Sequence, residues 1–150
     1  MEDYIKKVRK VIGHDPMLLP HAVVIVFDKD NKVLVETRAD DGYLDFPGGN
    51  VEIAEEVKNT AKRELFEETG LIADELELFD IYSGEITKYT YFNQDVIYGV
   101  DVVYLCKKYH GELKMDPKEV KELRFMDIND INGPLSPRNK QIIMDLKERL

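Results

Sequence analysis

The sequence has no tryptophan, only one cysteine and no long apolar run. The single cysteine, Cys106, cannot form an internal disulfide, which favours a reducing compartment over secretion. The longest apolar run, residues 22–27, is far below the roughly 20 residues that a membrane-spanning helix needs. Residues 1–7 lack the apolar stretch of a signal peptide. These absences predict a cytoplasmic protein without a membrane partner.

Positive charge is also scarce, because 21 Lys and Arg residues face 30 Asp and Glu residues and leave a net charge of −9. Such a surface repels phosphate backbones, which argues against nucleic acid as a partner. A small nucleotide is anionic too, and a bound divalent cation would reverse the local field where its phosphates sit. The alternative is that the acidic surface only keeps the protein in solution.

The length of the chain suits one domain. Its 150 residues, of which 43% are apolar and 34% charged, are typical of a globular protein. The sequence shows no internal repeat, low-complexity tract or domain boundary. We therefore predict a single domain over residues 1–150, in which residues 1–19 form an N-terminal helix and loop extension. Monomer and homodimer both remain open.

Apolar periodicity and turn residues predict strands in the middle of the chain with helices between and after them. The expected helices cover residues 4–12, 54–69 and 137–149, with Gly70 ending the second and Ser136 capping the third. The expected strands cover residues 21–28, 32–37, 75–91, 96–109 and 123–127. Pro16 and Pro20 are expected to hold an extended loop. This order predicts an α/β or α+β fold, with a mixed sheet flanked by helices.

The expected helix over residues 54–69 carries an unusual arrangement of charge. Its apolar residues fall within an arc of about 80°, and they are Ala54, Val57, Ala61 and Leu65. Three glutamates with i, i+3, i+4 spacing lie beside that stripe, namely Glu64, Glu67 and Glu68. Like charges at this spacing, in the last turn, destabilise a helix. A hard divalent cation would stabilise them, whereas the alternative is a solvated acidic face.

The loop before this helix, Phe46-Pro47-Gly48-Gly49, contains two consecutive glycines. Glycine lets the backbone approach a ligand closely, so a carbonyl of this loop would be able to join the shell of a cation. The alternative is that the loop is simply a turn.

These residues together resemble the Nudix box. The pattern is filled at every fixed position between residues 49 and 71: Gly49, five residues, Glu55, seven residues, Arg63-Glu64-Leu65, one residue, Glu67-Glu68, one residue and Gly70-Leu71. The chain is therefore identified as similar to the MutT-like Nudix hydrolase superfamily, with a looser resemblance over residues 20–150. The resemblance implies a Nudix-type α/β/α sandwich.

The resemblance also implies roles for individual residues. Glu64, Glu67 and Glu68 would be ligands of Mg²⁺, or of Mn²⁺ as a substitute, together with the carbonyl of Gly48. Arg63 would orient the glutamates through charge-assisted hydrogen bonds. The alternative for Arg63 is an ordinary surface arginine. Glu55 would support the box helix, where the alternative is a plain acidic residue at a helix start.

The implied reaction is attack by a metal-activated water on one phosphorus of a diphosphate linkage. The proton acceptor stays open between a box glutamate, Glu64 or Glu67, and a glutamate far along the chain. The distal candidates are Glu119 and Glu122, and the alternative for each is a solvated loop acid.

Substrate contacts are the least specified part of the sequence. The chain departs from many relatives at Leu44, where they have tryptophan, and at Ala54, where they have glycine. A tyrosine of the middle strands would be able to stack on a nucleobase, although cross-strand packing is the better explanation for any single one of them. The expected substrate contacts are Arg38, Phe46, Gly49 and Tyr89. Three phosphate-binding cations remain open, namely Arg38, Lys88 and Arg138.

The leading hypothesis is a hydrolase of small nucleoside diphosphate derivatives or nucleoside triphosphates. The derivatives include dinucleoside polyphosphates, nucleotide sugars and ADP-ribose. One alternative is removal of pyrophosphate from RNA 5′ ends, against which the net charge argues. Another is a regulator that binds a nucleotide without cutting it, against which the complete set of box glutamates argues.

Overall fold

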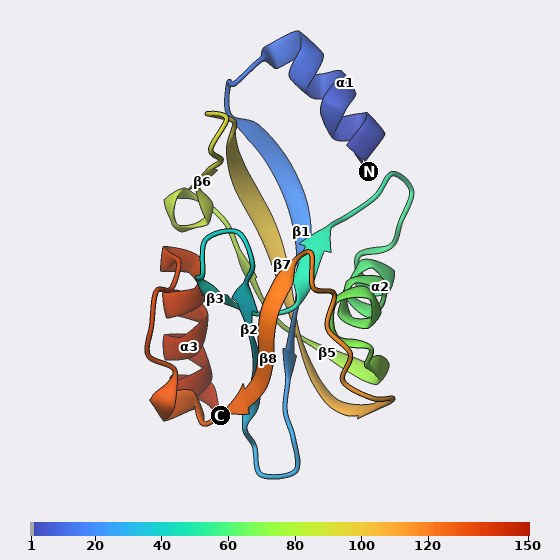
Figure 1. Ribbon diagram of the computed structural model, residues 1–150, viewed down its shortest axis with the longest axis vertical. Helices are drawn as coiled ribbons and strands as arrows, with labels where there is room; N and C mark the ends of the chain where they lie inside the picture. The colour runs from blue at the N-terminus through green and yellow to red at the C-terminus, as the bar shows by residue number, and fades with distance from the viewer. Residues whose placement is uncertain (1) are drawn as a thin grey trace.

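The computed structural model describes residues 2–150, in which three helices surround two β-sheets (Figure 1). The helices are α1 (Glu2–Ile12), α2 (Val57–Thr69) and α3 (Pro137–Arg149), and the 3-10 turns are η1 (Glu85–Thr87) and η2 (Ile128–Asp130). The strands are β1 (Met17–Val26), β2 (Val33–Arg38), β3 (Leu44–Asp45), β4 (Gly48–Asn50), β5 (Ile72–Tyr82), β6 (Tyr89–Thr90), β7 (Val96–His110) and β8 (Val120–Met126). None of the helices described is long and apolar enough to cross a membrane.

The larger sheet has the strand order β4-β1-β7-β5, with β6 also paired to β7. Strands β1 and β7 run parallel, whereas the other pairs of this sheet are antiparallel. The smaller sheet, β3-β2-β8, is antiparallel throughout. The mixed sheet predicted from the sequence is therefore confirmed.

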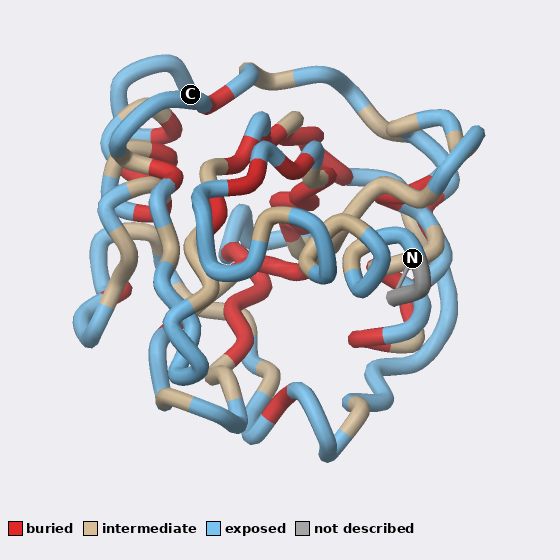
Figure 2. Tube along the Cα trace, turned by 90° about the horizontal axis from the view of Figure 1, so that it is seen from above, coloured by how far each residue is buried: buried red, intermediate tan, exposed pale blue. Residues whose placement is uncertain are grey.

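Strand β1 supplies side chains to both hydrophobic cores, because successive residues of a strand point to opposite faces. Ala22 and Val24 pack toward α2, and Val23 and Ile25 belong to the core that α3 covers. Each buried Val or Ile side chain contributes roughly 1.5–3 kcal/mol to folding. The buried stretches gather in the middle of the molecule (Figure 2), and α2 and α3 lie on opposite sides of the strands (Figure 1). This is the expected α/β/α sandwich.

Helix α2 begins at Val57, three residues later than the sequence predicted. Ala54 has φ of 65°, a left-handed conformation that cannot continue a right-handed helix, so the predicted apolar stripe loses that residue. The other end follows the prediction. Gly70 adopts φ of 79°, and its N–H donates to the carbonyl of Phe66 at 2.9 Å.

Strands β5 and β8 each begin three residues earlier than predicted, and two further boundaries were wrong for identifiable reasons. Strand β1 begins at Met17, inside the expected loop, because the parallel strand β7 provides hydrogen-bonding partners from Ile97 onward. The long strand expected over residues 75–91 ends at Tyr82, because Gly84 has φ of 85° and η1 follows it. In helix α3 the expected cap is present, since the Ser136 side chain accepts from the N–H of Asn139.

Candidate active site

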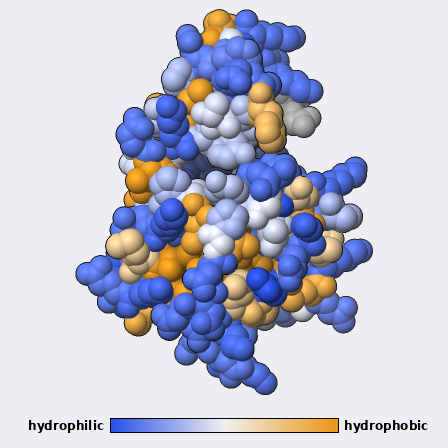
Figure 3. Space-filling model, turned by 60° about the vertical axis from the view of Figure 1, so that its left-hand side comes forward, coloured by the Kyte–Doolittle hydropathy of each residue, from blue (hydrophilic) through white to orange (hydrophobic). Residues whose placement is uncertain are grey.

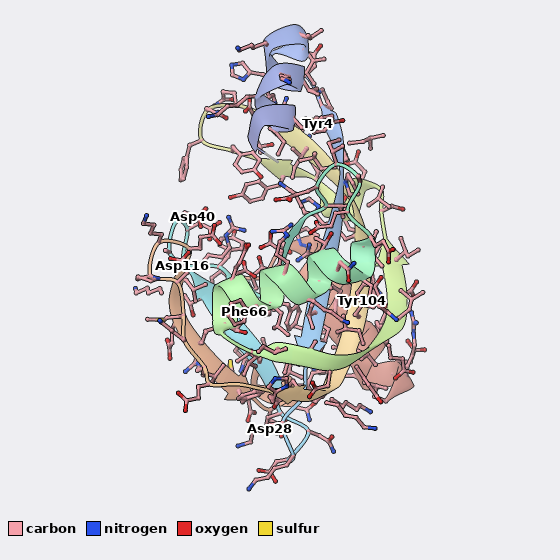
Figure 4. All side chains as sticks on the ribbon, turned by 90° about the vertical axis from the view of Figure 1, so that its right-hand side faces the viewer. Tyr4, Asp28, Asp40, Phe66, Tyr104 and Asp116 are labelled. Atoms are coloured by element: carbon pink, nitrogen blue, oxygen red, sulfur yellow. The ribbon has the colours of Figure 1, made fainter. Side chains whose placement is uncertain are left out.

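A cavity of about 430 Å³ lies below the end of the molecule that carries α1 (Figure 3). Segments far apart in the sequence meet there, including α1, β1, the loops on both sides of β3, helix α2, the residues around β6 and the start of α3. Helix α2 lies over the larger sheet in front of Tyr104, while Phe66 on its other side is exposed (Figure 4). The site is therefore assembled by tertiary packing around one edge of α2.

Glu64 lies on the cavity side of α2 and accepts a hydrogen bond from Nη1 of Arg63 at 2.8 Å. Burial, followed by the nearby charges of Glu67 and Glu119, raises the pKa of Glu64 to about 7 against the opposing effect of Arg63. A Cβ atom on Gly49 would collide with the Glu64 carboxyl group. Glycine at position 49 therefore lets the loop and this carboxylate approach each other.

Glu68 is buried beneath the glycine loop, with 7% of its surface exposed. Its carboxylate accepts from the N–H of Gly48 at 2.7 Å, which ties α2 to β4. Burial, followed by the charge of Glu36, raises the pKa of Glu68 although the bond from Gly48 opposes the shift. A Cβ atom on Gly48 would collide with the carbonyl oxygen of Ala22, so the close packing of β4 on β1 requires glycine there.

The third box glutamate, Glu67, points toward solvent with 55% of its side chain exposed, and it contacts Nη1 of Arg63 at 3.3 Å. Arg63 also donates to Glu55 at 2.8 Å and to the carbonyl of Asn50 at 3.1 Å. The hydrogen bond from Arg63, joined by one from the Thr60 hydroxyl, outweighs burial and lowers the pKa of Glu55 to about 2. The contacts expected of Arg63 and Glu55 are thus present.

Glu36 on β2 was missed by the reasoning from sequence. It is only 4% exposed, and its Oε2 atom has no hydrogen-bond partner in the part of the chain that the structure describes. Burial, followed by the charge of Asp45, raises the pKa of Glu36, and Arg38 offsets only part of this effect. The one signal in the sequence was an acidic residue directly after the apolar run of β2.

The carboxylates of the box glutamates and Glu36 are the kind of ligand that a hard divalent cation prefers, although they do not meet at one point in this structure. Within residues 2–150, no three Asp, Glu, His or Cys side chains are grouped closely enough to hold an ion. Arg63 binds the carboxylates of both Glu64 and Glu67. The charge of Glu64 nevertheless raises the pKa of both Glu36 and Glu68, and the buried Oε2 atom of Glu36 has no hydrogen-bond partner among the residues described. A cation would relieve both costs, so the residues fit one.

Of the two distal candidates for a proton acceptor, only Glu119 lines the cavity. Its charge raises the pKa of Glu64, which shows that the two carboxylates lie near each other. Glu122 does not line the cavity. It lies on β8 opposite Thr37, its side chain is 54% exposed, and its nearest basic partner is Arg124 at 3.7 Å. The structure therefore places Glu119, and not Glu122, at the cavity.

The three candidate cations differ in how fully they are already paired. Arg38 contacts Asp40 at 2.7 Å, and Arg138 contacts Asp45 at 3.0 Å. Lys88 also lines the cavity, and it has no acidic partner among the residues described. A side chain that is already neutralised has less charge to offer a phosphate group, so the structure favours Lys88.

Aromatic residues of the cavity have two different roles. Phe46 is 3% exposed and belongs to the core beneath α3, so it lines the cavity mainly as part of that core. Tyr89 forms an edge-to-face pair with Tyr91, with ring centroids 4.8 Å apart. The guanidinium of Arg38 lies over the Tyr89 ring at 5.5 Å, and the Tyr89 hydroxyl donates to Asp41 at 3.3 Å.

A buried polar network closes the side of the cavity near α3, and sequence reasoning did not find it. Asp101 bonds to Nδ1 of His21 at 2.9 Å and accepts from Arg138 at 3.1 Å. Burial alone would raise the pKa of Asp101, but these two partners outweigh it and lower the pKa below the ordinary value. Arg138 also bridges to Asp45.

Comparison with known proteins places the fold and the site in context. Residues 17–146 match the NUDIX domain family. The chain is 34% identical over 128 residues to the ADP-ribose pyrophosphatase of Methanocaldococcus jannaschii, covering 83% of this chain and 70% of that protein. It is 26% identical to an RNA pyrophosphohydrolase of Wolbachia pipientis, with 88% of each chain covered. The crystal structure of a MutT NUDIX hydrolase from Burkholderia pseudomallei superposes with a TM-score of 0.74 at 21% identity, covering 87% of this chain and 98% of that one.

Proposed function

Because the chain belongs to the Nudix family and is a nucleotide pyrophosphohydrolase, we propose that it uses Mg²⁺ to hydrolyse a small nucleoside diphosphate derivative of the ADP-ribose type. One observation carries this proposal. Both the box carboxylate Glu64 and the distal Glu119 line a cavity of about 430 Å³, and both raise the pKa of the buried Glu36.

We assign the cation to Glu64 and Glu68, with Glu67 and the carbonyl of Gly48 completing its ligands. When bound, Mg²⁺ neutralises charge on the phosphoryl oxygens and lowers the pKa of water. Mn²⁺ accepts the same oxygen ligands and would substitute. Arg63 positions the glutamates, because its guanidinium is fixed by Glu55 and reaches both Glu64 and Glu67.

Glu119 is the proposed proton acceptor. It lines the cavity, near the carboxylate of Glu64. In the proposed step the oxygen of water bonds to phosphorus, its proton passes to Glu119, and the bond from phosphorus to the bridging oxygen breaks. Lys88 is the proposed contact for the phosphate farther from the box, since its charge is not neutralised by an acidic neighbour.

The substrate class rests on two supports. The Methanocaldococcus jannaschii relative is named as an ADP-ribose pyrophosphatase, and its similarity extends over 83% of this chain. The acidic residues of the cavity and the net charge of −9 also oppose a long phosphate backbone, which argues against RNA.

The experiment is a substrate panel with Mg²⁺, consisting of ADP-ribose, a dinucleoside polyphosphate, nucleoside triphosphates and RNA with a 5′ triphosphate. Hydrolysis is followed by release of phosphate, pyrophosphate or nucleoside monophosphate. We expect ADP-ribose to be cut with the highest kcat/KM. Cleavage of the RNA alone would support the alternative activity, and nucleotide binding without any cleavage would indicate a regulator.

Single variants test the assigned residues. Glu68→Gln and Glu119→Gln should each lower kcat by about 100-fold or more while the circular dichroism spectrum is retained. Glu122→Gln is the matched control, because Glu122 lies three residues after Glu119, on β8 and outside the cavity. The kcat of this variant should stay within about twofold of wild type. Lys88→Ala should raise KM about tenfold with little change in kcat. Equal losses in the Glu119 and Glu122 variants would contradict the assignment of the base.

A further inference from the structure

Helix α1 precedes the stretch of the chain that matches the family, yet its residue Ile5 lines the cavity. We propose that α1 and β6 together form the subsite that holds the nucleoside base of the substrate, and that α1 therefore determines which nucleotides are accepted. This inference rests on the proposed function, because it concerns the same cavity. It goes further in assigning base recognition to a segment outside the matched domain.

The cavity has two chemically different ends. Carboxylates gather where β4 and α2 meet, whereas apolar and aromatic side chains gather beside α1, namely Ile5, Ile97, Tyr89 and Tyr91. Along β1, Asn50 of β4 pairs with His21, and Ile97 of β7 pairs with Met17. Four residues of a strand separate these points, a distance of about 13 Å. A nucleotide can therefore place its phosphates at one end and its base at the other.

The aromatic wall is organised before any substrate binds. The guanidinium of Arg38 stacks on one face of the Tyr89 ring, and the Tyr89 hydroxyl donates a hydrogen bond to Asp41. Tyr91 meets it edge to face at an interplanar angle of 76°, and Tyr91 remains 41% exposed. A fixed ring with an accessible surface suits stacking of a flat base, because little side-chain freedom is lost on binding.

The wall on the α1 side is equally fixed. Ile5, Val8 and Ile12 pack on a small cluster at the start of β1 and β7. Arg9 donates to the carbonyls of Asp15 at 2.7 Å and Val96 at 2.8 Å, and these bonds fasten α1 to the loop after it and to β7. In Figure 4, α1 with Tyr4 stands across an opening from the loop that carries Asp40. The helix is therefore a fixed part of the cavity wall, and it packs on the same cluster as Tyr89.

The test compares Ile5→Ala with Val11→Ala, a substitution on the same helix at a position that is 85% exposed. Each variant is assayed on ADP-ribose and on phosphoribosyl diphosphate, which keeps a diphosphate but has no base. Binding of AMP is measured by calorimetry in EDTA, so that one readout is independent of catalysis. Tyr91→Leu repeats the comparison at the aromatic pair, in case the Ile5 variant fails to fold.

We expect Ile5→Ala and Tyr91→Leu to raise KM for ADP-ribose and to weaken AMP binding about tenfold each, with kcat nearly unchanged. Phosphoribosyl diphosphate should be cut by these variants as by wild type, and Val11→Ala should match wild type throughout. An equal loss on both substrates, or unchanged AMP affinity, would overturn the inference while leaving the proposed function standing. Failure of wild type to cleave either substrate would count against the proposed function, and absence of AMP binding would count against the subsite.

Discussion

Replacing Glu36 by methionine should stabilise the metal-free protein and reduce the further stabilisation that Mg²⁺ provides. In the metal-free protein the Oε2 atom is buried without a partner, and a buried unsatisfied polar group costs about 1–3 kcal/mol. Methionine has a similar volume and no oxygen, so Glu36→Met should stabilise this form by about 2 kcal/mol. For a chain of this length that corresponds to a rise in Tm of about 5 °C.

With Mg²⁺ present the same change removes a negative charge from beside the cation ligands. The stabilisation by Mg²⁺ should therefore be smaller in Glu36→Met than in wild type, because ligand binding raises stability in proportion to the logarithm of affinity. The assay is a thermal melt in EDTA and in a series of Mg²⁺ concentrations. Glu122→Met on the neighbouring strand is the control and should change stability by less than about 0.5 kcal/mol.

A lower Tm for Glu36→Met in EDTA would refute this reasoning, since it would show that the carboxylate already has a stabilising partner. An unchanged response to Mg²⁺ would show that Glu36 lies too far from the cation to influence it.

Three other changes have definite expected outcomes. Gly49→Ala should change stability little, because the carboxyl group at the end of the Glu64 side chain can move away from the added Cβ atom, but that displacement should lower kcat/KM by about 100-fold, and wild-type activity in a purified sample would disprove the need for this close approach. Ala54→Gly should raise the free energy of unfolding in urea by about 1 kcal/mol, because glycine adopts the left-handed conformation at little cost; a loss of stability would contradict the strain argument. Asp101→Asn should lose about 2 kcal/mol at pH 7. Since its folded pKa is lowered, the carboxylate stabilises the protein fully above about pH 4, so urea unfolding should show the difference between Asp101→Asn and wild type shrinking as the pH falls from that value through the lowered folded pKa, and a difference that grows as the pH falls would be inconsistent with the assigned cause.

The sequence was sufficient for the parts of the site that lie close together along the chain. The spacing of Glu64, Glu67 and Glu68 follows from helix geometry, and the cap at Gly70 follows from its preference for positive φ. Roles for Arg63 and Glu55 came from the resemblance to a known family, and the structure then supplied their contacts.

Contacts between distant segments were beyond the reach of the sequence. In the sequence Glu36 looks like an ordinary surface acid. Its burial depends on the pairing of β2 with both β3 and β8, which is a property of the tertiary fold. Ile5 reads as part of an amphipathic helix, and only packing brings it to the cavity. The positive φ of Ala54 was signalled only by the glycine that many relatives have at this position, because alanine itself does not favour that conformation.

Strand β1 has neighbours on both edges and a hydrophobic core on both faces. Deleting a single residue within it would turn Ala22 and Val24 toward the space that Val23 and Ile25 now fill, because side chains alternate along a strand. Because β4 pairs with β1, the same shift would also move Gly48 away from Glu68 on α2, whose carboxylate accepts a hydrogen bond from its N–H. An insertion or deletion in this strand would therefore abolish both folding and catalysis. Functional variants that differ in length should carry their insertions and deletions in the loops.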